Sequence, residues 1–162
     1  MLIAAAAVYG GVSYTALKRE QLNELDALCH MLRLMQDELE TRALPLPELA
    51  AQLEERTESA GKALLSGLLR RLPVLGSQDF QSIWKESVTE SVKHSEDAAR
   101  LLCTLGSFLG RYDVDSQLEA IRSCRETLEK LRTTAAEALP QTRRLGMGLA
   151  LTSGALIVIT LI

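Results

Sequence analysis

The sequence predicts an all-α protein: a six-helix bundle whose first and last helices continue into an N-terminal and a C-terminal transmembrane helix. Apolar residues recur at three- and four-residue steps, which is typical of amphipathic helices, and no alternating run of β-branched residues indicates a strand. The membrane segments are indicated by the charges. The 18 basic and 21 acidic residues all lie between Lys18 and Arg144, so both ends of the 162-residue chain are uncharged.

Each uncharged end fits a membrane-spanning helix. Residues 145–162 are apolar, and as a helix they rise about 27 Å, close to the thickness of the hydrocarbon layer of a bilayer. Residues 1–17 are shorter and rich in alanine, with tyrosines near both ends that suit a membrane interface. Basic pairs flank residues 18–144 on both sides, so the positive-inside rule predicts that this domain is cytoplasmic.

Each end also has an alternative interpretation. The C-terminal segment could be a buried core helix, although little chain is left to surround so apolar a terminus. The N-terminal segment could be a cleaved signal peptide. A signal carries its positive charge before the apolar stretch, whereas Lys18 and Arg19 follow it. Two membrane spans remain the favoured interpretation.

Six helices are predicted from the breakers and caps. Prolines 45 and 47 end the first helix, Pro73 ends the third, and Ser95 caps the fifth. The fifth helix is expected to end near Gly110, and Asp113 or Asp115 to cap the sixth. The predicted helices are 14–42, 47–59, 61–72, 78–91, 95–110 and 113–144, with a kink expected at Pro140.

The first and last helices carry matched apolar stripes. The first stripe is Leu22, Leu25, Leu28, Leu32, Met35 and Leu39. The last is Leu118, Ile121, Cys124, Leu128, Leu131, Ala135 and Ala138. These two helices are therefore expected to pack side by side, with the four shorter helices completing the bundle.

Residues with catalytic or metal-binding chemistry are sparse. His30 and His94 lie far apart, and neither has zinc-ligand spacing. The cysteines at 29, 103 and 124 form no CxxC pair and are expected to be free thiols in apolar positions. A net charge of −3 argues against nucleic-acid binding. The sequence predicts no enzyme, no metal and no cofactor.

Small residues recur at four-residue steps in two places. Gly106 and Gly110 lie on the predicted fifth helix, and Gly146, Ala150 and Gly154 lie on the C-terminal span. Such spacing lets helix backbones approach closely, most effectively in lipid. The C-terminal set predicts a packing face toward the first span or toward a second copy of the chain.

A family resemblance is carried by residues 105–117, which read LGxxLGxxDxxxQ. This run is similar to a segment of the stage III sporulation protein AB family. Glu38 near the end of the first helix, Trp84 mid-chain and the Arg144-Leu145-Gly146 junction also match. The resemblance covers the whole chain. The N-terminal apolar segment departs from the family pattern, because no basic residue precedes it.

The resemblance implies a role in spore formation. Members of this family sit in the mother-cell membrane around the forespore, within the channel complex of the stage III A proteins. Their helical domain resembles the cytoplasmic domain of the inner-membrane platform protein of type II secretion and type IV pilus machines. By that analogy, the chain is expected to be a non-enzymatic scaffold that engages a cytoplasmic ATPase, stage III sporulation protein AA.

The same resemblance selects the candidate site residues. Gly106, Gly110, Asp113, Gln117 and Trp84 match the family, either as a structural helix–turn–helix corner or as a partner-binding corner. A membrane sensor or signalling adaptor is the alternative function. It would need output chemistry such as a phosphorylatable histidine, for which this chain offers only His30.

Overall fold

A computed structural model describes residues 2–42, 44–109 and 113–160, with side chains described for 16–42, 44–109 and 113–138. The described part of the chain is helical, and no strand lies between the helices. They are α1 (Leu2–Arg42), α2 (Leu46–Arg56), α3 (Ser59–Arg71), the 3-10 turn η1 (Leu72–Val74), α4 (Phe80–Ser91), α5 (Glu96–Leu105) and α6 (Val114–Thr160).

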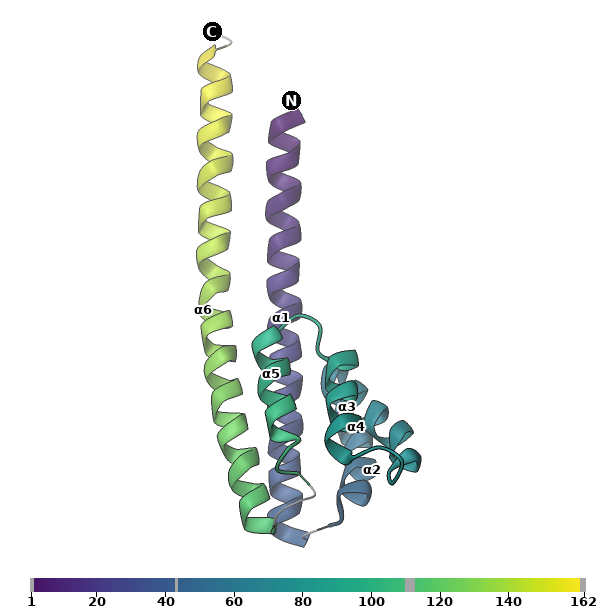
Figure 1. Cartoon of the computed structure of the whole chain (residues 1–162). Coiled ribbons are helices and arrows are strands. Elements are labelled where there is room, and N and C mark those ends of the chain that lie inside the picture. Colours follow the sequence, from purple (N-terminus) through teal and green to yellow (C-terminus); the bar gives the residue numbers. More distant parts are fainter. Residues whose placement is uncertain (1, 43, 110–112, 161–162) are drawn as a thin grey trace.

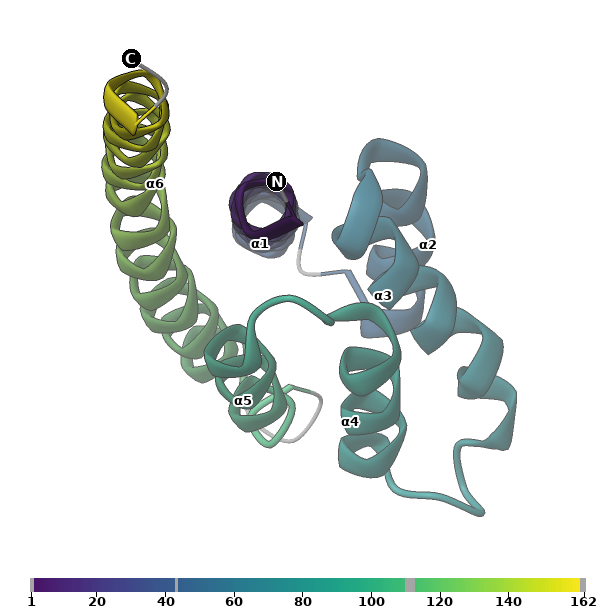
Figure 2. The same cartoon turned by 90° about the horizontal axis from the view of Figure 1, so that it is seen from above.

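The two longest helices form the axis of the molecule. α1 and α6 run antiparallel, pack more extensively on each other than any other pair, and extend beyond the bundle toward the same side (Figure 1). Seen from above, α6 curves past α1, while α2, α3 and α4 lie on the other side of α1 and α5 fills the space between (Figure 2). The predicted side-by-side packing of the first and last helices is therefore confirmed.

The matched stripes build the core. Leu25, Leu28 and Leu32 of α1 and Ile121 and Leu128 of α6 are fully buried, as their spacing predicts. The shorter helices contribute their own apolar faces to the same cluster. A core of this kind, spread over six helices, supplies the burial that a domain of this size needs to fold.

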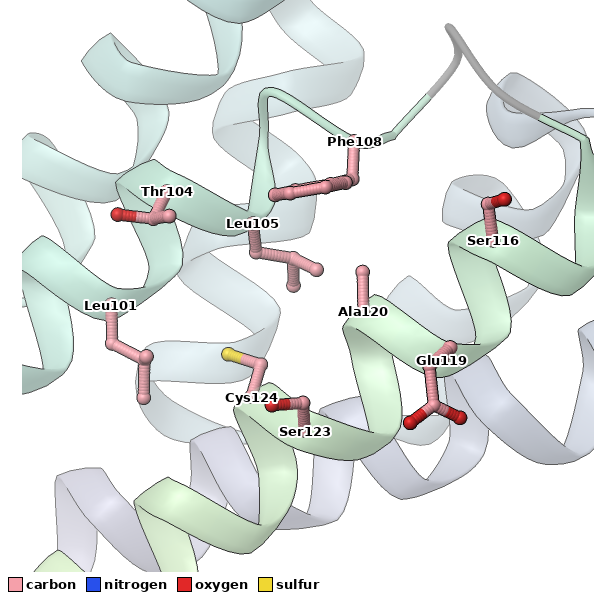
Figure 3. Close-up of a pocket in the computed structure, with 9 residues that line it drawn as sticks. All are labelled: Leu101, Thr104, Leu105, Phe108, Ser116, Glu119, Ala120, Ser123 and Cys124. Atoms are coloured by element: carbon pink, nitrogen blue, oxygen red, sulfur yellow. The ribbon is translucent and has the colours of Figure 1, made fainter.

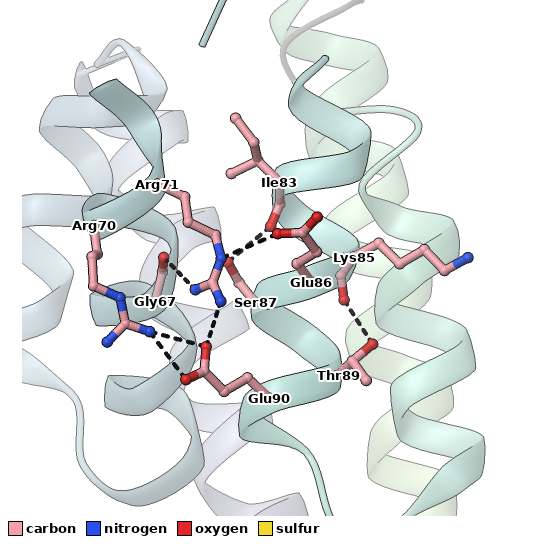
Figure 4. Close-up of polar contacts among 9 residues, drawn as sticks. All are labelled: Gly67, Arg70, Arg71, Ile83, Lys85, Glu86, Ser87, Thr89 and Glu90. Atoms are coloured by element: carbon pink, nitrogen blue, oxygen red, sulfur yellow. Dashed lines mark hydrogen bonds and ion pairs between the residues drawn. The ribbon is translucent and has the colours of Figure 1, made fainter. Parts of the chain in front are cut away.

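Ion pairs link neighbouring helices on the surface. Arg70 and Arg71 at the end of α3 reach Glu90 of α4 at 3.0 and 2.7 Å, and Arg71 also reaches Glu86 (Figure 4). These hydrogen bonds raise the pKa of Arg71 and lower that of Glu90. All four groups are at least partly exposed, so the cluster orients α3 against α4 more than it stabilises the fold.

Each helix predicted from the sequence is present, but some predicted helix ends are wrong. The fifth helix ends at Leu105 and does not reach the segment near Gly110 as predicted. After Leu105 the chain makes tight turns, in which Ser107 N–H donates to Thr104 and Phe108 N–H donates to Leu105. Gly106 therefore lies after the end of α5. The prediction that Gly106 and Gly110 form a four-residue spacing on the fifth helix is wrong. The second helix is also shorter than predicted, because Thr57 adopts an extended conformation.

The predicted membrane spans fall mainly on residues whose side chains are not described. α1 is helical from Leu2 and α6 is helical to Thr160, and α6 passes Pro140 without a break. Among the described residues, no helix combines enough length and apolar character to cross a bilayer. The predicted packing face at Gly146, Ala150 and Gly154 lies outside the described side chains.

Candidate functional site

Two of the candidate residues, Trp84 and Gly106, form one contact. Trp84 of α4 is fully buried, and its indole Nε1 donates a hydrogen bond of 2.6 Å to the carbonyl oxygen of Leu102 in α5. Gly106 follows α5 directly above the indole ring, where a Cβ atom would lie 2.2 Å from Cδ1 of Trp84. Gly106 is thus required by close packing, since its backbone is ordinary right-handed helical.

The next candidates lie where α6 begins. The Asp113 carboxylate accepts hydrogen bonds from the Ser116 backbone N–H at 2.9 Å and from its hydroxyl at 3.1 Å, and these bonds lower the Asp113 pKa. Asp113, one of the two predicted caps, is therefore the N-cap of α6. Gln117, one turn later, is half-buried and donates its backbone N–H to Asp113. Gly110 lies outside the described residues.

A groove opens between α5 and α6 beside this corner. It encloses about 570 Å³ and is walled mainly by apolar side chains, with hydroxyls and one carboxylate at its edge (Figure 3). Its lining is Leu101, Thr104, Leu105, Phe108, Ser116, Glu119, Ala120, Ser123 and Cys124. Phe108, after α5, is 40% exposed and Val114, the first residue of α6, is 38% exposed. The end of α5 and the start of α6 lie at the end of the bundle opposite to the two chain termini (Figure 1).

The three cysteines have raised pKa values, and one of them, Cys124, lines the groove. All three are free thiols. Burial is the main cause that raises the pKa of Cys29 to about 11 and that of Cys124 to about 12, with a smaller contribution to Cys124 from Cys29. Burial also raises the Cys103 pKa, although nearby Lys85 opposes it. Since the thiolate is the reactive form, thiol catalysis has little support here.

The sequence analysis missed a buried carboxylate. Glu24 of α1 is only 6% exposed and accepts hydrogen bonds from the backbone N–H groups of Lys93 (2.8 Å) and His94 (3.1 Å), in the turn between α4 and α5. His94 Nε2 also lies 3.7 Å from the Glu20 carboxylate. The sequence did contain a signal for this site: Glu24 lies four residues before Leu28 and so falls on the buried face of α1.

The other residues of interest have simpler places. Glu38, which matches the family pattern, pairs with Arg56 of α2 and with Arg42 one turn along α1. His30 lies on α1 and His94 lies in the turn between α4 and α5, and the described residues contain no group of three or more side chains suited to a metal ion. Among the described candidates, Trp84 thus contacts Gly106 after α5. Asp113 and Gln117 lie at the start of α6.

The architecture defines a class: a helical-bundle protein built around two long antiparallel helices that leave the bundle at one end. The family model for stage III sporulation protein AB matches residues 1–162, and the chain belongs to that family. This membership gives the protein a role in sporulation.

A solved structure supports the fold. The chain is similar to a structure of stage III sporulation protein AB, with 21% sequence identity and a TM-score of 0.65, over 75% of this chain and 97% of the other. At that identity the likeness bears on the fold alone. A search of curated proteins finds no match.

Proposed function

We propose that this protein is a non-enzymatic membrane platform of the complex that links the mother cell to the forespore. Residues 1–17 and 145–162 would anchor it in the mother-cell membrane around the forespore, with residues 18–144 in the cytoplasm. The bundle would engage stage III sporulation protein AA, the ATPase, and other stage III A proteins. Self-association through the spans is a further part of the proposal.

One observation carries this proposal: both long helices continue from the bundle toward the same side. The ion pair of Asp26 with Arg132 sets the level of α1 against α6. Extending this antiparallel register by eight residues pairs Lys18 with position 140. The two limits of the charged region, Lys18 and Arg144, then differ by only about 6 Å in height. A bilayer would need such a common level if both segments cross it.

The groove between α5 and α6 is the surface we propose for the ATPase. It lies at the end of the bundle away from both termini, where a cytoplasmic partner would have access (Figure 1). Exposed Phe108 is an aromatic residue, a type enriched at protein interfaces, and Val114 at the start of α6 adds a second exposed apolar side chain. Trp84 lies buried beneath and would support this corner without contacting a partner.

The test uses the full chain in phospholipid nanodiscs, mixed with the purified ATPase and separated by size-exclusion chromatography. Co-elution of the ATPase with the loaded discs, and not with empty discs, is the expected result. Absence of co-elution, together with normal sporulation after deletion of the gene, would contradict the platform role. Recovery of the chain in a carbonate wash of the membranes would separately contradict anchorage.

A further inference from the structure

We propose that the turn between α4 and α5, centred on Lys93 and His94, lies against the anionic headgroups of the same bilayer that anchors the chain. This inference rests on the proposed membrane anchorage and adds a third contact with the membrane, besides the two spans. The ligand class is the anionic phospholipid headgroup.

The position of the turn is the first argument. Apart from α1 and α6 themselves, this turn is the part of the bundle nearest to the side toward which both termini extend (Figure 1). It is fixed at the level of Glu20 and Glu24, because Glu24 binds its backbone and His94 lies beside Glu20. These two residues are about 5 and 10 Å along α1 from Leu17, the last residue of the predicted span. The headgroup layer is about 5–8 Å thick on each side of a bilayer, so the turn would lie within the outer part of that layer or at its surface.

The charges of the turn are the second argument. Lys93 is exposed and has no acidic partner among the described residues, and Arg19 on α1 is in the same situation. Of the acids nearby, Glu24 is bound by the backbone of the turn, and the Glu20 carboxylate lies 3.7 Å from His94 Nε2.

At the start of α5, Glu96 and Asp97 share a single partner, Arg100. Cations within a Debye length of an anionic bilayer are attracted to it, which favours Lys93 and Arg19 facing the lipid.

The rigidity of the turn is the third argument. The buried Glu24 carboxylate binds two consecutive backbone N–H groups, Lys93 and His94, which fixes the backbone and directs both side chains outward, where they are exposed. On α1, the helix that carries Glu24, Leu17 lies one residue before the first charged residue, Lys18. Its side chain is apolar and 56% exposed. A fixed third contact would hold the tilt of the bundle relative to the bilayer.

Lysine footprinting of the unmodified full chain tests this contact. The chain is placed in nanodiscs of pure phosphatidylcholine or of phosphatidylcholine with one third phosphatidylglycerol, and acetylation of each lysine is followed by mass spectrometry. Lys93 should react several-fold more slowly in the anionic discs. Lys85 and Lys130 are exposed internal controls, and they should react at the same rate in both. Lys130 precedes Arg132 and is farther from the membrane.

Equal rates of Lys93 relative to Lys130 in the two lipids would overturn the proposal. A photocrosslinking amino acid at position 93 gives an independent measurement: it should form phospholipid adducts, whereas the same group at position 130 should form none. Absence of adducts at 93 in a chain that resists carbonate extraction contradicts the lipid contact alone. A chain that carbonate extracts contradicts the membrane platform as well.

Discussion

The two ends of α5 are held by different chemistry. At its start, the turn at Lys93 and His94 is fixed by the buried carboxylate of Glu24 and carries exposed basic side chains. At its end, Gly106 packs on the indole of Trp84, and the chain then exposes the apolar Phe108 beside a groove. The polar end faces the side of the termini, and the apolar end faces away from it (Figure 1). This difference suits one end to a lipid surface and the other to a protein partner.

The largest expected effect comes from the support under the apolar end. Trp84→Ala removes a fully buried side chain and its hydrogen bond to Leu102. The variant should lose about 3–5 kcal/mol of unfolding free energy, which urea denaturation of the purified chain can measure. A loss below about 1 kcal/mol would mean that the corner does not depend on this side chain.

The polar end should be the next most sensitive. Glu24→Ala leaves two backbone N–H groups of the turn without their acceptor and should cost about 2–3 kcal/mol. Hydrogen exchange at Lys93 and His94 should accelerate more than at other amides. Glu20→Ala, which removes only an exposed partner of His94, is the matched control and should change little. Equal effects of the two substitutions would refute the role assigned to Glu24.

Two glycines, Gly106 and Gly67, differ in how closely a neighbouring side chain packs on them. A Cβ atom at position 106 meets the indole, so Gly106→Ala should destabilise the protein by about 1–3 kcal/mol. A Cβ atom at position 67 in α3 meets only ordinary contacts, the nearest at 3.4 Å. Gly67→Ala should therefore be neutral or slightly stabilising, as alanine favours a helix. Thermal melting of both variants checks this, and a lower melting temperature for Gly67→Ala than for Gly106→Ala would contradict it.

The smallest expected effect is the pH dependence of the cap at the apolar end. The Asp113 pKa is lowered from its ordinary value of 3.8 by the Ser116 hydrogen bonds. The capping contribution is therefore complete above about pH 4 and is lost as the pH falls through the lowered value. Denaturation curves of the parent and of Asp113→Asn should converge as the pH falls through the lowered Asp113 pKa, while the parent is slightly more stable at neutral pH. A stability difference between parent and variant that grows as the pH falls would contradict this prediction.

Local patterns predicted most of the fold, since helix positions and buried stripes depend on neighbours three and four residues apart. The stripe containing Leu28 and Leu32 was predicted and is buried. Contacts between distant residues were not predictable. Trp84 and Gly106 were selected separately by resemblance, and only the structure brings them together. The turn held by Glu24 joins positions about seventy residues apart, which no periodicity can indicate.

The central claim, that the groove at the apolar end of α5 engages the sporulation ATPase, has a direct test. Full-length chain in nanodiscs is titrated with the ATPase, comparing Phe108→Glu with Leu75→Glu. Leu75, 49% exposed beyond η1, is an apolar control of similar exposure outside the groove. The account predicts that Phe108→Glu weakens binding at least about tenfold while Leu75→Glu binds like the parent. Equal affinity of the two variants, or no binding by the parent, would contradict it.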